Sequence, residues 1–229
     1  MAHLILTFAA PWDKPPPLRT TMALEAGPPD PFLADDFLAV SAETEAFTPA
    51  QIDALRAHRS TLTATARFEG PGKLDAAREA ARLMADAFAA GALGVRVETG
   101  LKVLAPDAVA GLDLRDKSVL LHLFVEVLFE DDQVCTLGLQ AFDLPDVAVR
   151  CDVDDDAEAV AAQGAAFALA AKMVIDGVRP IDGGVFRASE SAPLYRVVRE
   201  APIPEDEATP FDNPRGLVVL KTVSGSAAV

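Results

Sequence analysis

The chain has 229 residues, and 51% of them are hydrophobic, which is enough apolar material for a sizeable core. Its 35 acidic side chains outnumber the 20 basic ones and give a formal net charge of −15. This charge argues against a nucleic-acid backbone as the partner, because phosphate binding needs clustered Lys and Arg. It is compatible with solubility alone or with a basic protein partner.

The amino-terminal residues 1–6 lack the basic stretch and the cleavage site of a signal peptide. The Ala-rich helix pattern in the second half is interrupted by Gln163 and Lys172, so it is not predicted to span a membrane. The two cysteines, Cys135 and Cys151, do not make a disulfide framework. We therefore expect a cytoplasmic protein with reduced thiols and no membrane contact.

The first half begins with an expected strand at residues 3–8, which a proline-rich segment at 9–31 separates from the rest. Thr48 followed by Pro49 is typical of a helix start, with Thr48 as the N-cap and Pro49 as the first helical residue. A short helix is therefore predicted from this point.

Residues 61–68 alternate between apolar and polar side chains, which predicts a strand with one buried face. Residues 74–90 carry apolar side chains at helical spacing, and Gly91 ends the pattern. Residues 93–99 return as a strand. The first half therefore predicts a strand–helix–strand unit.

Residues 117–129 form the longest apolar run, and their β-branched and aromatic content predicts a strand that is buried on both faces. His122 and Glu126 interrupt this run. On a strand they share one face and lie about 13 Å apart, at ~3.3 Å per residue. Three readings stay open: a polar site on the sheet, a partly wet sheet edge, or a core histidine bonded to a carbonyl.

Residues 134–142 and 147–153 predict two short strands joined by a bend at Leu144-Pro145-Asp146. The acidic run 152–156 follows, and its carboxylates suit the first turn of a helix because they accept hydrogen bonds from free N–H groups. That helix is expected to end just before Gly177. The acidic run lacks the glycine and the distant glutamate of a calcium loop, so helix capping is preferred to a metal site.

Five residues of this helix repeat at spacings of four and three and predict one buried stripe: Val160, Gly164, Phe167, Ala171 and Val174. Gly164 costs roughly 1 kcal/mol against Ala in the middle of a helix. Small residues let a helix lie close to a sheet, so this segment is interpreted as the central packed helix.

Residues 185–188, 194–199 and 217–223 predict further strands, and the acidic, proline-rich segment 201–215 predicts a surface loop between the last two. Paired strands mixed with helices indicate an α+β fold. We expect a mixed or mostly antiparallel sheet with two long helices packed on it.

The whole chain, residues 1–229, is interpreted as one domain. Its first half covers about residues 1–116, its second half covers about residues 117–223, and a tail at 224–229 is expected to fray. Two similar β-α-β halves that share one sheet are a further hypothesis, although no residue-level repeat proves duplication. Exposed strand edges leave a monomer and a homodimer open.

Four features of the second half carry a resemblance. They are the pattern T-x-G-L-x-x-F-x-L-P-D at residues 136–146, the acidic helix start, Asp182-Gly183-Gly184, and F-x-N-P-x-G-L at residues 211–217. Residues 118–223 thereby resemble a bacterial family known only as a domain of unknown function. The matching motifs are turn and packing motifs. Because the family has no established activity, the resemblance implies no catalytic residues.

Arg187 and Tyr195 are expected on neighbouring strands, where the pair either binds an anion or simply packs. Asp182 precedes two glycines in a turn between the long helix and a strand, whereas a phosphate loop needs the turn to lead into a helix. The residues that we select as candidates for binding are His122, Glu126, Asp182, Arg187 and Tyr195.

The sequence has no HExxH, GxSxG, CxxC or Walker motif, and no two of its histidines are at ligand spacing, so no metal or cofactor is expected. Together with the acidic charge, this favours a non-catalytic binding or regulatory module of a bacterial cytoplasm. One specific form is a protein that caps a basic partner. The alternative is a hydrolase-type enzyme whose site gathers side chains from distant strands, those of His122, Glu126, Asp182 and Arg187.

Overall fold

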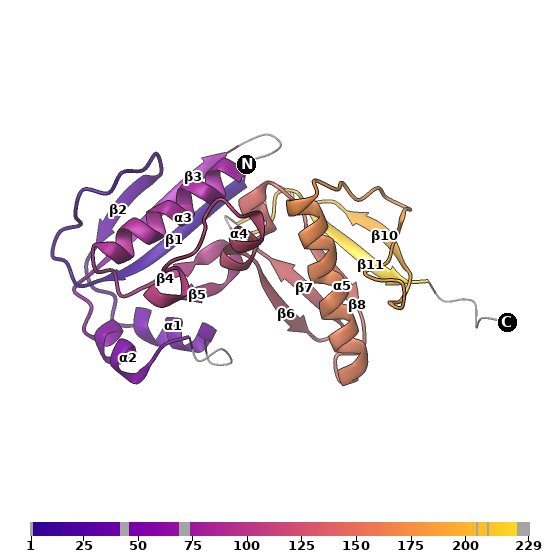
Figure 1. The fold of residues 1–229 in the computed structure, drawn as a ribbon, viewed down its shortest axis with the longest axis horizontal. Coiled ribbons are helices and arrows are strands. Elements are labelled where there is room, and N and C mark those ends of the chain that lie inside the picture. Colours follow the sequence, from indigo (N-terminus) through magenta and orange to yellow (C-terminus); the bar gives the residue numbers. More distant parts are fainter. Residues whose placement is uncertain (1, 42–45, 69–73, 205, 210, 224–229) are drawn as a thin grey trace.

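The computed structural model describes residues 2–41, 46–68, 74–204, 206–209 and 211–223, so the predicted tail at 224–229 lies outside the described residues. The α+β class is confirmed, because helices accompany sheets that are antiparallel or mixed. The strands form two sheets that lie side by side, rather than one shared sheet, and one long helix covers each of them (Figure 1).

The first sheet, sheet A, has the order β2-β3-β1-β4-β5 and is antiparallel throughout. Its strands are β1 (Ala2–Ala10), β2 (Ala23–Gly27), β3 (Ser60–Phe68), β4 (Gly94–Val97) and β5 (Lys102–Leu104). Strand β1 is the central strand, and its first six residues alternate between buried and half-buried. The predicted strand at 61–68 is confirmed, because it pairs with β1 along its length.

Three helices accompany sheet A, with bounds α1 (Leu33–Ser41), α2 (Pro49–Arg56) and α3 (Leu74–Ala89). The predicted start of α2 is confirmed: the Thr48 hydroxyl accepts the N–H of Gln51, and the Gln51 side chain accepts the N–H of Thr48. Helix α3 buries an Ala-rich face against the main core. Helices α1 and α2 form a smaller core of their own with Ala9 and Val103.

The second sheet, sheet B, has the order β6-β7-β8-β11-β10-β9. Its strands are β6 (Glu126–Glu130), β7 (Gln133–Leu137), β8 (Asp146–Arg150), β9 (Val185–Phe186), β10 (Tyr195–Glu200) and β11 (Leu217–Thr222). Only the β8–β11 pair is parallel. Helix α5 (Asp156–Ile175) packs on β7 and β8.

Helix α5 begins as the acidic run predicts, since the Asp155 carboxylate accepts the N–H groups of Ala157 and Glu158. The predicted buried stripe is wrong in its first half, because Val160 is 66% exposed and Gly164 is exposed. Its second half packs against the core, where Val174 is buried and Phe167 and Ala171 are half-buried. The helix instead buries a neighbouring face rich in alanine, whose small side chains allow close approach to the sheet. By length and composition alone α5 has enough apolar residues to cross a membrane, and 44% of that stretch is buried within the protein.

The predicted continuous strand at 117–129 is wrong. Residues Lys117–Phe124 form helix α4, and only the following residues form β6. The Asp116 carboxylate caps the helix by accepting the N–H of Ser118 at 2.8 Å. The N-cap and the leucines that the helix buries therefore favour a helix more strongly than the β-branched and aromatic residues of the run favour a strand.

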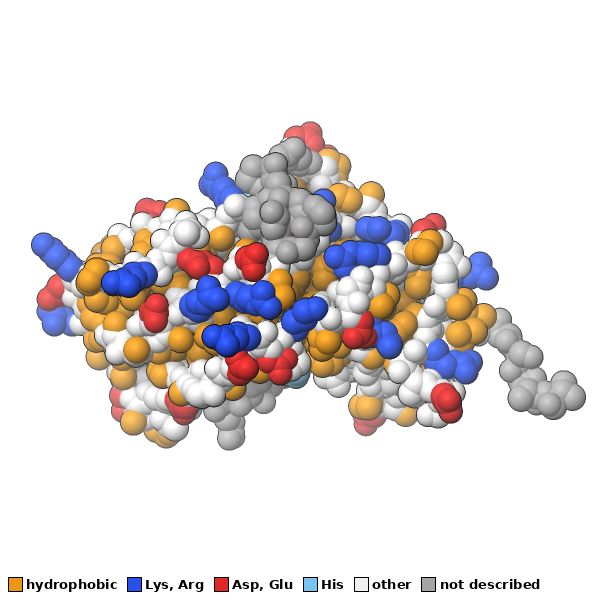
Figure 2. Space-filling view, turned by 45° about the horizontal axis from the view of Figure 1, so that its top comes forward, with side chains coloured by type: hydrophobic (Ala, Val, Ile, Leu, Met, Phe, Trp, Pro, Cys, Tyr) orange, Lys and Arg blue, Asp and Glu red, His pale blue; other side chains and the backbone are white. Residues whose placement is uncertain are grey.

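Within the described residues, short 3₁₀ helices connect these elements: η1 (Glu98–Gly100), η2 (Pro106–Ala108) and η3 (Leu139–Phe142). Figure 2 shows several Lys and Arg side chains close together on the face in view, with Asp and Glu side chains beside them.

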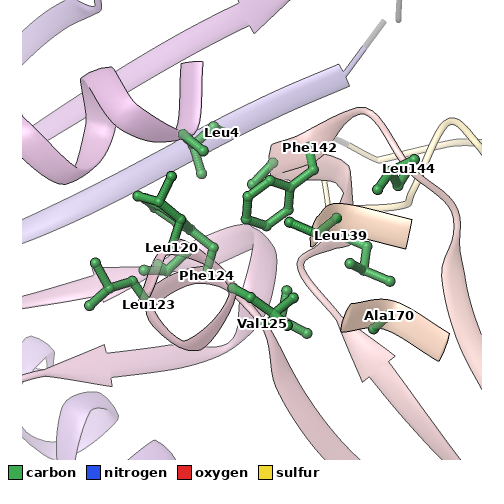
Figure 3. Close-up of a cluster of buried hydrophobic side chains, with 14 of the residues drawn as sticks. Leu4, Leu120, Leu123, Phe124, Val125, Leu139, Phe142, Leu144 and Ala170 are labelled. Atoms are coloured by element: carbon green, nitrogen blue, oxygen red, sulfur yellow. The ribbon is translucent and has the colours of Figure 1, made fainter. Parts of the chain in front are cut away.

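The two halves meet in one connected core. Figure 3 shows side chains of β1, α4, η3 and α5 in contact there, with Leu4, Phe124, Phe142 and Ala170 labelled. The rings of Phe124 and Phe142 pack edge to face, with centroids 6.2 Å apart. Residues that are far apart in the sequence thus hold sheet A and sheet B together.

The halves share the succession of strands, a long helix and more strands, but they differ in pairing. In sheet A the strand that follows the long helix, β4, is antiparallel to β1. In sheet B the last strand, β11, is parallel to β8, the strand just before the helix. The similarity of the halves is therefore one of element order and not of sheet topology.

Candidate functional site

His122 lies on the exposed side of α4 and not on a strand. Its Nδ1 atom lies 2.7 Å from the carbonyl oxygen of Ser118, one turn earlier in the same helix. Its ring packs against Phe167 of α5, with ring centroids 5.2 Å apart. The ring contact joins α4 to α5, the Ser118 contact lies within α4, and together they account for a histidine at this position without a ligand.

We expect His122→Ala to lower the free energy of unfolding by no more than about 1 kcal/mol, because the side chain is exposed and loses one ring contact. Leu121→Ala is the comparison, since Leu121 is 1% exposed and its truncation costs about 2–5 kcal/mol. Urea unfolding of both variants measures the difference. A cost for His122→Ala as large as that for Leu121→Ala would contradict this assignment.

Glu126 is the first residue of β6, and its carboxylate lies 3.1 Å from the Nζ atom of Lys102 on β5. The same ammonium group donates to the carbonyl of Val125 at 3.3 Å. Strands β5 and β6 are the neighbouring edges of the two sheets, so this ion pair joins them. Because His122 is helical and Glu126 is in a strand, the predicted shared strand face is wrong.

Asp182 and Arg187 lie before and after the short strand β9, and both are exposed. The Asp182 carboxylate accepts the backbone N–H of Arg199 at 2.9 Å. The Arg187 guanidinium donates to the backbone carbonyl of Glu190 at 3.3 Å. The Asp182 side chain thus ties the turn before β9 to β10, and the Arg187 side chain holds a local turn.

Tyr195 is buried in β10, where it pairs with Phe186 of β9, next to Arg187 in the chain. Burial raises the pKa of its hydroxyl, and the neighbouring Cys151 and Glu158 add to the effect. Among the larger hollows lined by described residues, one includes Glu126 and none includes any of the other four candidates. The five candidate residues are therefore not gathered around one hollow.

A different group of polar side chains converges where β7, η3 and β8 meet. Strand β7 ends at Leu137, Gly138 turns the chain with a φ of +107°, and β8 begins at Asp146. The Asp146 carboxylate accepts the N–H of Leu139 at 3.0 Å and lies 3.4 Å from the Thr136 hydroxyl. That hydroxyl in turn accepts the N–H of Val147 at 2.9 Å.

The second oxygen of Asp146 binds a residue from a distant segment. The Asn213 side chain donates to it at 2.6 Å and to the Leu144 carbonyl at 2.9 Å. We call Thr136, Leu139, Asp146 and Asn213 the Asp146 cluster. Burial raises the pKa of Asp146 to about 6, while the hydrogen bonds from Asn213 and Leu139 oppose that rise. The cluster ties the turn before β8 to the loop before β11.

An ion pair between a buried carboxylate and a half-exposed arginine repeats this connection three residues earlier. The Asp143 side chain is 1% exposed, and the Arg215 guanidinium donates a hydrogen bond to each of its two oxygens, at 2.6 and 3.0 Å. Such two-point pairing fixes orientation as well as charge. Asp143 and Asp146 thus hold the 213–216 segment through two independent contacts.

A groove of about 420 Å³ opens beside the Asp146 cluster, and we call it the acidic groove. Its lining includes four carboxylates, those of Glu130, Asp146, Glu200 and Asp212. Among the described residues that line it, none is Lys or Arg. Ile203 and Phe211 also line it and are 49% and 57% exposed, so apolar surface accompanies the negative charge.

The acidic groove lies on the face of sheet B that α5 leaves uncovered. Cys135 and Leu217 line the groove and belong to a small apolar cluster with Ala148 and Val219, separate from the core under α5. Successive strand residues point to opposite faces, so this second cluster marks the opposite face of the sheet. Burial, and then Glu130, raise the pKa of the Cys135 thiol to about 12, which keeps it protonated and a poor nucleophile near neutral pH.

Within the described ranges, no group of three or more His, Cys, Asp or Glu side chains is arranged to hold a metal ion. The carboxylates of the acidic groove are instead engaged in protein hydrogen bonds or exposed: Asp212, for example, accepts from the N–H and the hydroxyl of Thr209.

Comparisons with known proteins found no match among family models, curated proteins or solved structures. The resemblance to a bacterial family of unknown function therefore stays a prediction. Its motif residues nevertheless have clear structural roles, because Thr136, Gly138, Asp146 and Asn213 all belong to or adjoin the Asp146 cluster.

The Asp146 cluster and the acidic groove were not selected as candidate sites from the sequence. The sequence offered one signal for this region, the T-x-G-L-x-x-F-x-L-P-D pattern together with Asn213. These residues indicated two turns but not that the two turns contact each other. Asp146 and Asn213 are 67 residues apart, and no periodicity relates them.

Proposed function

We propose that this protein is a non-catalytic binding module that holds a positively charged segment of a partner protein in the acidic groove. The supporting observation is the lining of that groove, with four carboxylates, no described Lys or Arg, and two exposed apolar side chains. A basic segment that also carries an apolar residue complements such a surface. A cytoplasmic location is part of this proposal.

Two of the four carboxylates are placed to meet a partner. Glu130 and Glu200 are exposed, and Glu130 accepts from the Gln133 side chain through one of its two oxygens. Asp146 is buried, and Asp212 accepts two hydrogen bonds within its own loop. The strands β6, β7, β10 and β11 form one sheet and fix the positions of Glu130 and Glu200, while Ile203 and Phe211 belong to the loop between β10 and β11. A preformed groove lowers the entropy cost of binding an extended segment.

The test is a titration of a fluorescent peptide that carries alternating Lys and Leu residues. We expect the pair Glu130→Gln and Glu200→Gln to weaken binding at least about fivefold, because each substitution removes one negative charge from the groove. Raising the salt from about 50 to about 300 mM is expected to weaken wild-type binding as well, through screening.

The matched control is the pair Asp53→Asn and Asp86→Asn. These exposed carboxylates lie on α2 and α3, away from the groove, and their removal changes the net charge by the same amount. The control pair is expected to bind the peptide as the wild type does. Equal weakening in both pairs would mean that overall charge attracts the peptide, and the groove proposal would fail.

A further inference from the structure

A second hollow lies near the turn before β8 and the loop before β11, which also border the acidic groove. Its lining is mainly basic, whereas that of the acidic groove is acidic. It measures about 200 Å³, and we call it the basic groove. Three arginines from three segments line it: Arg179 after α5, Arg199 at the end of β10, and Arg215 before β11. Asp143 is the one carboxylate among the described lining residues, and Leu, Pro and Met side chains form the remaining wall.

The hydrogen-bond donors of this groove are only partly used. Arg215 engages Asp143 through Nε and one terminal nitrogen, which neutralises that carboxylate and leaves the other terminal nitrogen. Arg179 uses one terminal nitrogen on carbonyl oxygens at 3.3 to 3.5 Å, including that of Met173 near the end of α5. Each guanidinium has five N–H donors, so most remain available.

Arg199 has the freest side chain of the three. Its backbone N–H binds Asp182, but its guanidinium makes no hydrogen bond or ion pair with any described residue. Asp182 does not line the groove. After the Asp143–Arg215 pair is set aside, two positive charges remain at one small hollow of a chain whose net charge is −15.

We propose that the basic groove binds the phosphate group of a small phosphorylated molecule. The paired N–H groups of a guanidinium match two oxygens of a phosphate. Because the donors come from three segments, they can reach more oxygens than the two that a carboxylate ligand offers, so a phosphate fits them better. The volume admits a phosphate and a few further atoms, so the ligand is small. This site is separate from the acidic groove and does not depend on the peptide proposal.

Isothermal titration calorimetry with inorganic phosphate, and then with glycerol 3-phosphate, tests this site on the full chain. The variant carries both Arg179→Gln and Arg199→Gln, while Arg215 is kept because it holds Asp143. We expect the affinity for both probes to fall at least about tenfold. Arg196→Gln is the control, since Arg196 lies on the same strand, is exposed, and points to the opposite face of the sheet.

The control variant is expected to keep wild-type affinity for phosphate, and the double variant is expected to keep its affinity for the Lys- and Leu-containing peptide. The proposal is overturned if the double variant binds phosphate as the wild type does. It is also overturned if the wild type shows no saturable phosphate binding below about 10 mM, or binds acetate as tightly as phosphate.

Discussion

Gly138→Ala is expected to lower the free energy of unfolding by about 3 kcal/mol or more, because it combines backbone strain with a steric clash. Gly138 has a φ of +107°, a conformation that side chains with a Cβ atom rarely adopt. A Cβ at this position would also overlap with the carbonyl oxygen of Phe124 at the end of α4, and Gly100 approaches that carbonyl from η1 in the same way. Urea unfolding of the variant measures this loss.

Gly164→Ala is the matched control for this prediction. Gly164 lies in the middle of α5, and a Cβ there would meet no atom within 4 Å. The same substitution should therefore stabilise the protein by up to about 1 kcal/mol, the difference in helix propensity between the two residues. Similar stability of the two variants would show that the junction of α4, η1 and η3 is not closely packed.

Asp146 is expected to make the free energy of unfolding depend on pH. Its protonated side chain, which predominates at low pH, is the form that favours the folded state. Burial raises its pKa from 3.8 in the unfolded chain to about 6 in the folded protein. The folded state therefore binds a proton more tightly than the unfolded state. Its contribution is complete below about pH 4 and is lost as the pH rises through about 6, a change of about 3 kcal/mol.

Asp146→Asn isolates this contribution, because asparagine does not titrate and the other ionisable groups are unchanged. From pH 7 to pH 4, we expect the wild type to gain about 3 kcal/mol of stability relative to this variant, measured by urea unfolding at each pH. Asp86→Asn on the exposed side of α3 serves as the control and should show no such change. A wild-type advantage that stays constant, or grows with rising pH, would disprove the raised pKa.

The two predictions concern the same region for a structural reason. Gly138 and Asp146 lie at the two ends of the segment that contains η3. This segment packs between the two halves through Leu139 and Phe142. The same segment supplies Asp146 to the acidic groove and Asp143 to the basic groove. The junction that holds the fold together thus also positions both of the proposed binding surfaces.

Features that depend on neighbouring residues were predicted well from the sequence. The cap at Thr48, the strand at 61–68 and the acidic start of α5 were all confirmed. Each rests on a contact between residues a few positions apart or on a regular alternation. The start of α4 has the same kind of signal in Asp116, but the apolar content of the following residues concealed it.

By itself, then, the sequence determined the α+β class, the places where capped helices begin, and the strongly negative charge. Only the tertiary structure decided that the strands form two sheets, that Asn213 meets Asp146, and that carboxylates and guanidiniums separate into two grooves. The physical reason is that pairing and burial join residues far apart along the chain. The free energy of such contacts depends on the packed surroundings, which no local pattern contains.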